Sequence, residues 1–260
     1  MAKLGFIGMG NMALALTAGF IETEALKPQE IAAFAPHQDK LKKNAGRLGF
    51  VPCTSLQELT QSSEALVMAC KPVQVEGVLK ELGESLSGKA LLSIASGWDF
   101  EAYAKHLPQG ARLQFIMPNT PVKVHEGALL FEDKNSLTEE EHAWAVKLFS
   151  SIGKIVEIPS DQMDIASAIT GCAPAFVDLF IEAYADVAVK YGVNRSQAYT
   201  LVSQMIEGSA ALQLATGEHP AALKDEVCSP GGTTIRGVCA LEEHGFRAAC
   251  EASIDAIMNS

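Results

Sequence analysis

The sequence predicts an α/β fold in which a Rossmann-type, doubly wound sheet in residues 1–160 precedes an all-helical domain in residues 161–260. In the first part, short continuous apolar runs alternate with helix-like stretches, which is typical of repeated βαβ units. In the second part only helical periodicity remains. A chain of 260 residues is also long for one domain, so two domains are expected.

The apolar runs of the first domain are continuous rather than alternating, as expected of parallel strands that are buried on both faces. The predicted strands are Leu4–Ile7, Ile31–Phe34, Ala65–Cys70, Ala90–Ala95 and Leu113–Met117. Gly127–Phe131 and Lys154–Glu157, on either side of a helix near Leu137–Ser150, are predicted to complete the far edge of the sheet. Pro159-Ser160-Asp161 marks the domain boundary.

Helices fill the second domain. One apolar stripe contains Phe176, Leu179, Phe180, Ala183 and Val187, and Gly192 is placed to end that helix. A second helix is predicted from Ser196 to Ala215, with Gly217 as its stop, and shorter helices are predicted at 219–226, 233–243 and 246–258. These helices carry apolar residues on more than one face: Ala198, Leu201, Val202, Met205, Ala210, Leu212 and Leu214. Either a self-contained bundle or a partner subunit could bury them.

Composition and charge exclude several classes of protein. The chain is 48% hydrophobic and 20% charged, which excludes a disordered or collagen-like protein. Its 31 acidic and 20 basic residues give a net charge of −11, which argues against a nucleic-acid partner. The six cysteines form no CxxC pair and no zinc-like spacing, so reduced thiols and no metal site are expected. Because no window offers about 18 uninterrupted apolar residues, no membrane span is expected and the predicted location is cytoplasmic.

The first strand leads directly into a glycine-rich turn, Gly8-Met9-Gly10-Asn11-Met12-Ala13, which opens a helix. Because the GxGxxA pattern lies between a strand and a helix, it is identified as a dinucleotide-binding motif of the Rossmann type. Gly8 permits the tight turn, Gly10 lets the backbone approach a pyrophosphate, and Ala13 allows close packing of helix and strand. The motif predicts cofactor contacts from Gly8, Gly10, Asn11 and Met12, with the pyrophosphate at the helix N-terminus.

The end of the second strand bears on the choice of dinucleotide. A site for NAD usually has Asp or Glu there, to bind the 2′-hydroxyl of the ribose. Here Ala35 and Pro36 follow the strand, and the first acidic residue is Asp39. NADP(H) is therefore the preferred cofactor, with NAD(H) possible. His37 and Lys40 could add weak attraction for a 2′-phosphate, although either could simply be solvated.

Two later turns are predicted to border the same cofactor crevice. Ala69-Cys70-Lys71-Pro72 follows the strand Ala65–Cys70, at the carboxyl end where such crevices lie. Lys71 could hold phosphate or ribose oxygens there, or it could be a surface lysine. In Met117-Pro118-Asn119-Thr120-Pro121 the two prolines favour extended backbone, which leaves Asn119 and Thr120 as polar groups near the nicotinamide.

The densest motif is Ser229-Pro230-Gly231-Gly232-Thr233-Thr234, a loop that leads into a helix at Thr233. It offers unobstructed backbone N–H groups and hydroxyls at a helix N-terminus, which suits a substrate carboxylate. An ordinary capped helix start is the alternative interpretation.

With these motifs the chain resembles the Δ1-pyrroline-5-carboxylate reductases, which catalyse the last step of proline biosynthesis. The resemblance covers essentially the whole length. It rests on Gly8-Met9-Gly10-Asn11-Met12, Lys71-Pro72, Met117-Pro118-Asn119-Thr120, and above all Leu223-Lys224 through Ser229-Pro230-Gly231-Gly232-Thr233-Thr234. Further support comes from Gly171-Cys172-Ala173-Pro174-Ala175-Phe176, although Thr170, Cys172 and Ala173 depart from the Ser-Gly-Ser-Gly-Pro-Ala that the family typically has.

The resemblance implies NAD(P)H-dependent reduction of the cyclic imine pyrroline-5-carboxylate to L-proline. It also implies a homodimer formed through the helical domain, and many family members assemble further into rings of dimers. By analogy the substrate residues are Glu218, Val227, Ser229, Gly231, Gly232, Thr233 and Thr234. Thr234 would be the catalytic residue, because its hydroxyl would bind the ring nitrogen. Glu218 matches a family acid near the substrate, though its Glu-His-Pro setting could equally be a surface turn.

Two other functions remain open from the sequence. One is a related NADPH-dependent reductase that acts on another imine acid or on a hydroxy acid. Hydroxy-acid chemistry would normally use a Lys or His acid in the helical domain, and neither Lys190 nor Lys224 has the expected motif around it. The other is a non-catalytic regulator that binds a nucleotide.

Overall fold

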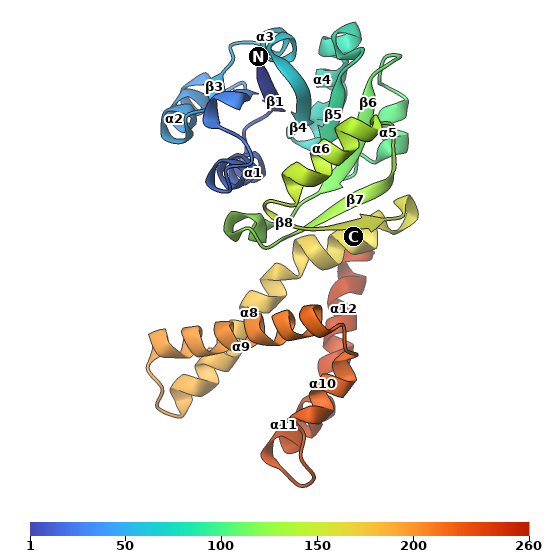
Figure 1. The fold of residues 1–260 in the computed structure, drawn as a ribbon. Coiled ribbons are helices and arrows are strands. Elements are labelled where there is room, and N and C mark those ends of the chain that lie inside the picture. Colours follow the sequence, from blue (N-terminus) through green and yellow to red (C-terminus); the bar gives the residue numbers. More distant parts are fainter. Residues whose placement is uncertain (260) are drawn as a thin grey trace. The chain divides into compact units, whose positions relative to one another are not determined.

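A computed structural model describes residues 1–259. The chain forms two compact units, one spanning Met1–Gly171 and the other beginning at Cys172 (Figure 1). The first unit contains a single sheet with helices on both faces, and the second is helical throughout the residues described.

The sheet of the first unit has the strand order β3-β2-β1-β4-β5-β6-β7-β8. Its strands are β1 (Ala2–Ile7), β2 (Ile31–Phe34), β3 (Val51–Pro52), β4 (Ser63–Met68), β5 (Ala90–Ser93), β6 (Arg112–Met117), β7 (Gly127–Asn135) and β8 (Gly153–Ile158). All neighbouring pairs are parallel except β6 and β7, which are antiparallel. The order reverses between β1 and β4, and such a switch point is where open α/β sheets bind ligands.

Helices cover both faces of this sheet, so each face has its own apolar core. The helices are α1 (Asn11–Glu22), α2 (Gln38–Leu48), α3 (Leu56–Ser62), α4 (Pro72–Leu82), α5 (Phe100–Ala104) and α6 (Glu139–Phe149). Helices α1, α2 and α6 pack on one face around Phe6, Leu16 and Phe149. Helices α3, α4 and α5 pack on the other, around Leu66, Val75 and Tyr103.

The predicted strands are confirmed with shifts at their ends. β2 has the predicted bounds, but β4 begins two residues early, at the fully buried Ser63, and ends at Met68 rather than Cys70. A buried hydroxyl breaks the apolar pattern at the start of β4, and Met68 is the last residue paired with β5. β3 was not predicted, because two exposed residues that include Pro52 carry no strand pattern.

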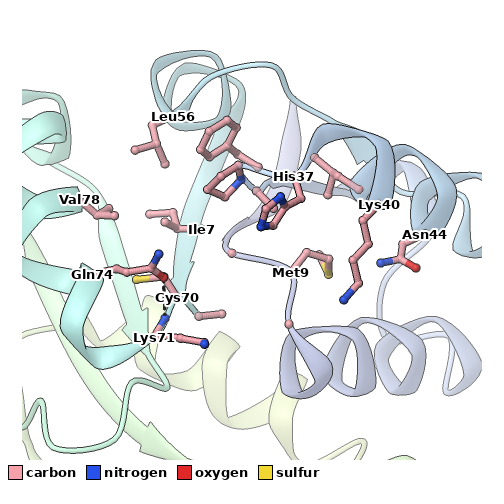
Figure 2. Close-up of a pocket in the computed structure, with 17 residues that line it drawn as sticks. Ile7, Met9, His37, Lys40, Asn44, Leu56, Cys70, Lys71, Gln74 and Val78 are labelled. Atoms are coloured by element: carbon pink, nitrogen blue, oxygen red, sulfur yellow. Dashed lines mark hydrogen bonds between the residues drawn. The ribbon is translucent and has the colours of Figure 1, made fainter.

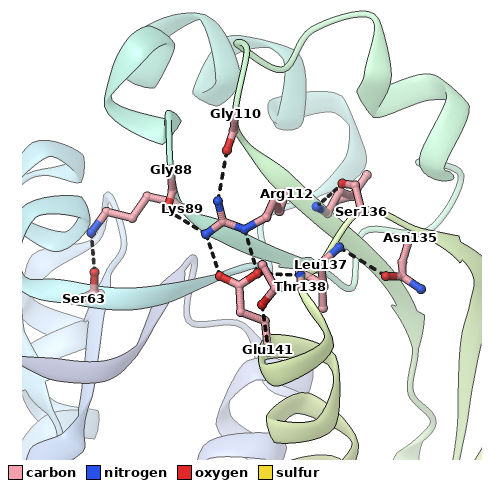
Figure 3. A network of polar contacts seen from close by, with 11 residues as sticks. Ser63, Gly88, Lys89, Gly110, Arg112, Asn135, Ser136, Leu137, Thr138 and Glu141 are labelled. Carbon is pink, nitrogen blue, oxygen red and sulfur yellow. Dashed lines mark hydrogen bonds and ion pairs between the residues drawn. The ribbon is translucent and has the colours of Figure 1, made fainter.

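The Arg112–Glu141 ion pair, called the clasp below, connects α6 to the amino ends of the strands (Figure 3). Arg112, the first residue of β6, donates from Nε and Nη2 to the two carboxylate oxygens of Glu141 at 2.7 and 2.6 Å. Its Nη2 also donates to the Gly88 carbonyl at 2.8 Å. Glu141 in turn caps α6 together with Thr138. The guanidinium lowers the pKa of Glu141 below its ordinary value, so the clasp is charged at neutral pH.

The segment after β8 belongs with the sheet rather than with the helical unit. Within α7 (Met163–Ser167), Met163 is buried against Phe115 and Leu130 of the sheet. The next turn, Ala168–Cys172, is a π-helix, and it ends just before Pro174. The compact units therefore divide at Gly171, whereas the boundary expected from sequence lies at residue 160.

The second unit consists of α8 (Pro174–Lys190), α9 (Arg195–Thr216), α10 (Pro220–Glu226), α11 (Thr233–Glu243) and α12 (Phe246–Met258). These bounds agree with the predicted helices to within one or two residues, and Gly217 ends α9 in the left-handed conformation as predicted. Between Cys172 and residue 259, only Ala185, Ala198 and Val202 are buried. Helices α8 and α9 thus contact each other but leave most of their apolar side chains exposed.

One helical run, Ser160–Lys190, is long and apolar enough by length and composition alone to cross a bilayer. By length and composition, this run differs from the expectation of no membrane span, which was based on uninterrupted apolar stretches. The run also carries Asp164, Asp178 and Glu182, and carboxylates are costly inside a bilayer. An apolar face interspersed with acids is more typical of a helix that packs on another protein surface.

Candidate active site

A cavity of about 480 Å³ opens at the carboxyl ends of β1, β2 and β4, at the switch point of the sheet (Figure 2). It is lined by Ile7, Gly8, Met9, Gly10, Phe34, Ala35, Pro36, His37, Lys40, Leu41, Asn44, Leu56, Ala69, Cys70, Lys71, Gln74 and Val78. It thus brings together Gly8, Gly10, Ala35, Pro36, Ala69, Cys70 and Lys71 of the predicted cofactor residues. Its volume is in the range of small-molecule sites.

The two glycines of the first turn have different reasons to be glycine. Gly8 has φ +95°, and a Cβ there would lie 2.8–2.9 Å from backbone atoms of Ala69 and Cys70. The fold itself therefore requires Gly8. At Gly10 a Cβ would meet no atom within 4 Å. Since the protein does not use that space, the glycine at position 10 fits a ligand that approaches the backbone, as the motif predicts.

The N-terminus of α1 is suited to an anion. Gly10 is its N-cap residue, no side chain caps it, and its first turn has no acidic residue. The first N–H groups, including those of Asn11 and Met12, thus have no side-chain acceptor. Neither of these two side chains lines the cavity. Ala13 is 1% exposed, in agreement with its predicted role in close packing of helix and strand.

The wall formed after β2 carries no acidic residue. Gln38 shapes this wall, because its side-chain amide donates to the carbonyls of Ala35 at 2.9 Å and Cys53 at 3.2 Å. His37 and Lys40 line the cavity, whereas Asp39 does not. In a chain with net charge −11, the cavity has two lysines and no carboxylate among its lining residues. This arrangement removes the repulsion that a 2′-phosphate would meet in an NAD-type site.

The wall formed after β4 combines a neutral thiol with a free cation. Burial raises the pKa of the Cys70 thiol to about 11, so the sulfur stays protonated at neutral pH and is no nucleophile. The thiol donates to Met68 Sδ at 3.5 Å. Lys71 is exposed at the N-cap of α4 and makes no ion pair with the residues described. Pro72 begins α4 and does not line the cavity.

Asn119 lies outside the cavity, and its side chain is fully engaged. The residue is 8% exposed; Nδ2 donates to the Thr170 carbonyl at 3.0 Å, and Oδ1 accepts from the backbone N–H of Ala128 at 2.9 Å. Asn119 therefore connects the end of β6 to the start of β7 and to the π-helical turn. Thr120 is exposed and does not line the cavity.

The helical unit contains the glycine-rich loop between α10 and α11. Gly231 has φ +70°, and Gly232 is the N-cap of α11 without a side-chain cap bond. Gly232 N–H donates to the Ser229 carbonyl at 3.0 Å, which closes the turn. Thr233 and Thr234 are exposed, and their hydroxyls bind no other described residue. The capped-start alternative is thus not realised by a side chain, and the first N–H groups of α11 remain available to an anion.

The other predicted substrate residues also lie on the surface of this unit. Glu218 follows the C-cap of α9; its backbone N–H donates to Thr216 Oγ1 at 3.2 Å, and its carboxylate binds no described residue. Val227 is 64% exposed and Ser229 is exposed. In residues 1–259, no group of three or more His, Cys, Asp or Glu side chains could hold a metal ion.

Sequence reasoning did not select several lining residues, of which Asn44 and Gln74 are polar. Asn44 lies one turn after Lys40 on α2, so the four-residue spacing was a usable signal. Gln74 Oε1 accepts from the Lys71 backbone N–H at 3.2 Å and caps α4.

Comparison with known proteins identifies the family. Residues 160–260 match the model described as pyrroline-5-carboxylate reductase dimerisation, and residues 3–97 match that described as NADP oxidoreductase, coenzyme F420-dependent. The pyrroline-5-carboxylate reductase of Treponema pallidum is 42% identical over 99% of both chains. That of Escherichia coli is 40% identical over 95% of this chain and 92% of its own.

A solved structure agrees with these matches. The pyrroline carboxylate reductase of Plasmodium falciparum, solved with NADP bound, superposes with a TM-score of 0.87 at 32% identity. It covers 98% of this chain and 95% of its own. The resemblance noted in the sequence is therefore confirmed over nearly the whole chain: the protein belongs to the pyrroline-5-carboxylate reductase family.

Proposed function

We propose that this protein reduces Δ1-pyrroline-5-carboxylate to L-proline, with NADPH as the preferred reductant. The observation that carries the proposal is the open space at Gly10, at an uncapped helix N-terminus, in a chain that matches the reductase family from end to end. A glycine that the fold does not need, beside N–H groups without acceptors, is what a bound pyrophosphate explains.

In the sheet unit, Gly8 and Gly10 shape the turn, and the N–H groups of Asn11 and Met12 receive the pyrophosphate. Ala35 and Pro36 border the adenosine ribose without an acidic side chain. On the opposite wall Ala69 and Cys70 shape the approach, and Lys71 supplies a cation to phosphate or ribose oxygens. Pro72 begins α4 and so fixes the start of the helix behind this wall. Asn119 supports the site through its bonds to Thr170 and Ala128. When bound, the dinucleotide supplies the hydride.

In the helical unit, the N–H groups of Gly231 and Thr233 hold the substrate carboxylate, and Ser229 adds a hydroxyl. Gly232 shapes this loop, because its own N–H is bonded to the Ser229 carbonyl. Val227 offers an apolar contact. Glu218 offers a carboxylate that makes no bond with the other described residues. The Thr234 hydroxyl binds the ring nitrogen. The imine carbon gains the hydride and the nitrogen gains a proton, so C=N becomes CH–NH. The protein's part is to orient and polarise the imine.

The proposal includes a homodimer formed through the helical unit, in the cytoplasm, with a ring of dimers as a larger assembly. Its support is the exposed apolar surface of α8 and α9, where Leu179, Leu201 and Leu214 are 60–65% exposed, in a region matched by a dimerisation model. Leu201→Glu is expected to yield monomers in analytical ultracentrifugation, whereas Val73→Glu, at a lone exposed apolar residue of α4, is expected to leave the dimer intact.

The test of the reaction is the oxidation of NADPH in the presence of pyrroline-5-carboxylate, with L-proline identified as the product. Gly10→Val serves as the inactive control. Oxidation of NADPH with a keto acid but not with the imine would favour the hydroxy-acid alternative. Dinucleotide binding without turnover of either substrate would favour the regulator.

A further inference from the structure

One face of α2 presents nitrogen donors to the cofactor cavity. His37 precedes the helix, and Lys40 and Asn44 follow one turn apart, so both side chains lie on the same face of α2. Buried Leu41 and Ala45 fix the rotation of the helix, because they pack into the apolar core on this face of the sheet. Figure 2 shows Lys40 and Asn44 extending from α2 toward the glycine turn that contains Met9.

These donors have no acceptor in the protein. Asn44 Nδ2 is shielded from water and has no hydrogen-bond partner among the residues described. Lys40 forms no ion pair within residues 1–259, and no side-chain bond joins His37 to the start of α2. A buried amide donor without an acceptor is costly. Because Asn44 also lines the cavity, a rotation of its amide toward an acceptor bound there would offset this cost.

The charge of the cavity limits what that acceptor is. None of the lining residues is acidic, and Lys40 is a compact cation on a flexible stem. A ribose 2′-hydroxyl is neutral and is usually bound by an Asp or Glu, so it would gain less from an ammonium group than an anion would. A phosphate monoester is dianionic and only accepts hydrogen bonds, so it satisfies an ammonium and an amide N–H together.

We propose that Lys40 and Asn44 determine the preference for NADP(H) by binding the 2′-phosphate, with Lys40 supplying the charge and Asn44 a directed donor. The proposal rests on the proposed use of a nicotinamide dinucleotide. It goes beyond the lack of an acid after β2, which removes a repulsion but provides no attraction. Selectivity then lies on the α2 face and not in the Ala35-Pro36 turn alone.

The test measures binding by isothermal titration calorimetry, without imine, for the full chain and the variants Lys40→Met and Asn44→Leu. Both changes keep the approximate size of the side chain and remove the donor. Lys43→Met is the matched control, because Lys43 is an exposed lysine of α2 that does not line the cavity. The ligands are NADPH, NADH, adenosine 2′,5′-bisphosphate and AMP.

Lys40→Met is expected to raise the Kd of NADPH and of the bisphosphate about ten- to a hundredfold, and Asn44→Leu about five- to tenfold. The Kd values of NADH and AMP should stay within about twofold, and Lys43→Met should change none of the four appreciably. Unchanged NADPH binding in both variants, or equal loss for NADPH and NADH, would overturn the assignment. If the unaltered chain binds neither dinucleotide, the proposed function fails and not merely this inference.

Discussion

The two units of the chain differ in how much of their structure they stabilise by themselves. The sheet unit buries large side chains on both faces, with Phe6, Phe20, Leu66 and Tyr103 fully enclosed. The helical unit buries only Ala185, Ala198 and Val202 among its described residues, all of them small or medium in size.

The difference indicates where each unit obtains its stability. Burial of an exposed leucine contributes roughly 1.5–3 kcal/mol. The sheet unit has gained this contribution within one chain, whereas the exposed leucines of α8 and α9 can gain it only against another surface. The cofactor cavity of the sheet unit is thus expected to form within one chain, whereas the helical unit is expected to need an assembly to become stable.

The largest expected effect comes from separating the units. A fragment of residues 1–171 is expected to fold cooperatively, remain monomeric and bind NADPH, but have no turnover. A fragment from residue 172 onward is expected to lack cooperative unfolding when monomeric, because its core is too small. Thermal unfolding followed by circular dichroism, together with ultracentrifugation, tests both. A dimeric 1–171 fragment would contradict the comparison.

A shorter fragment, 1–160, sharpens the same experiment. It loses the burial of Met163 and the bond from Asn119 to Thr170. Removal of a buried side chain of this size costs about 2–5 kcal/mol. The 1–160 fragment should therefore unfold at lower urea concentration than the 1–171 fragment. Equal stability would favour the boundary that was expected from sequence.

The second prediction separates folding from binding inside the sheet unit. Gly8→Val is expected to destabilise the protein by at least about 3 kcal/mol, because a side chain at φ +95° would clash with the backbone of Ala69 and Cys70. Gly10→Val should leave the unfolding free energy nearly unchanged, since its Cβ meets nothing within 4 Å, but should abolish NADPH binding. Urea titration and calorimetry measure the two quantities. Wild-type NADPH affinity in Gly10→Val would make the turn purely structural.

These two glycines also illustrate what the sequence could predict. Spacing alone identifies the turn, and most predicted strands and helices are confirmed, because buried parallel strands and amphipathic helices leave clear apolar patterns. The two-residue strand β3 and the π-helical turn leave no such pattern, since they depend on contacts with neighbouring elements. Asn44 was missed although it lies four residues after Lys40, because the packing of Leu41 and Ala45 is what shows that this face of α2 meets the cavity.

The third prediction concerns the helical unit. Thr234→Val keeps the branched shape and removes the hydroxyl proposed to bind the imine nitrogen. A hydrogen bond to a charged group is worth roughly 1.5–3 kcal/mol, or about ten- to a hundredfold in rate. The loss should lower kcat and not merely raise KM, because the bond strengthens as the nitrogen gains electron density. NADPH affinity should hardly change, because the cavity proposed for the cofactor is lined by residues of the sheet unit.

Thr233→Val is the neighbouring control for this experiment. Its hydroxyl is also exposed at the start of α11, but only its backbone N–H is assigned to the substrate. A smaller change in kcat is expected. Full kcat in Thr234→Val would remove the hydroxyl from the mechanism and leave positioning by the glycine loop.

The smallest expected effect is on the free energy of unfolding when one ion pair in each unit is removed. The Arg112–Glu141 clasp is about one quarter exposed, whereas Arg247 and Glu242 of the helical unit are 71% and 45% exposed. Glu141→Gln keeps the size of the side chain and is expected to cost about 1.5–3 kcal/mol of unfolding free energy at neutral pH. Glu242→Gln should have no measurable effect, because water already solvates its pair.

The same clasp gives a pH dependence whose sign follows from the pKa. Arg112 lowers the pKa of Glu141 below its ordinary 4.5. The contribution of Glu141 to the free energy of unfolding is therefore fully present above about pH 4.5 and is lost as pH falls through the lower pKa of the folded state.

A second carboxylate, Glu132 on β7, has the opposite sign because burial raises its pKa. Its contribution to the free energy of unfolding is present below about pH 4.5 and is lost as pH rises through the raised pKa. Urea unfolding from pH 3 to 7 should show a shallower acid loss in Glu141→Gln and a gain near neutral pH in Glu132→Gln. Parallel profiles for both variants and the unaltered chain would show that neither carboxylate determines the acid stability of the sheet unit.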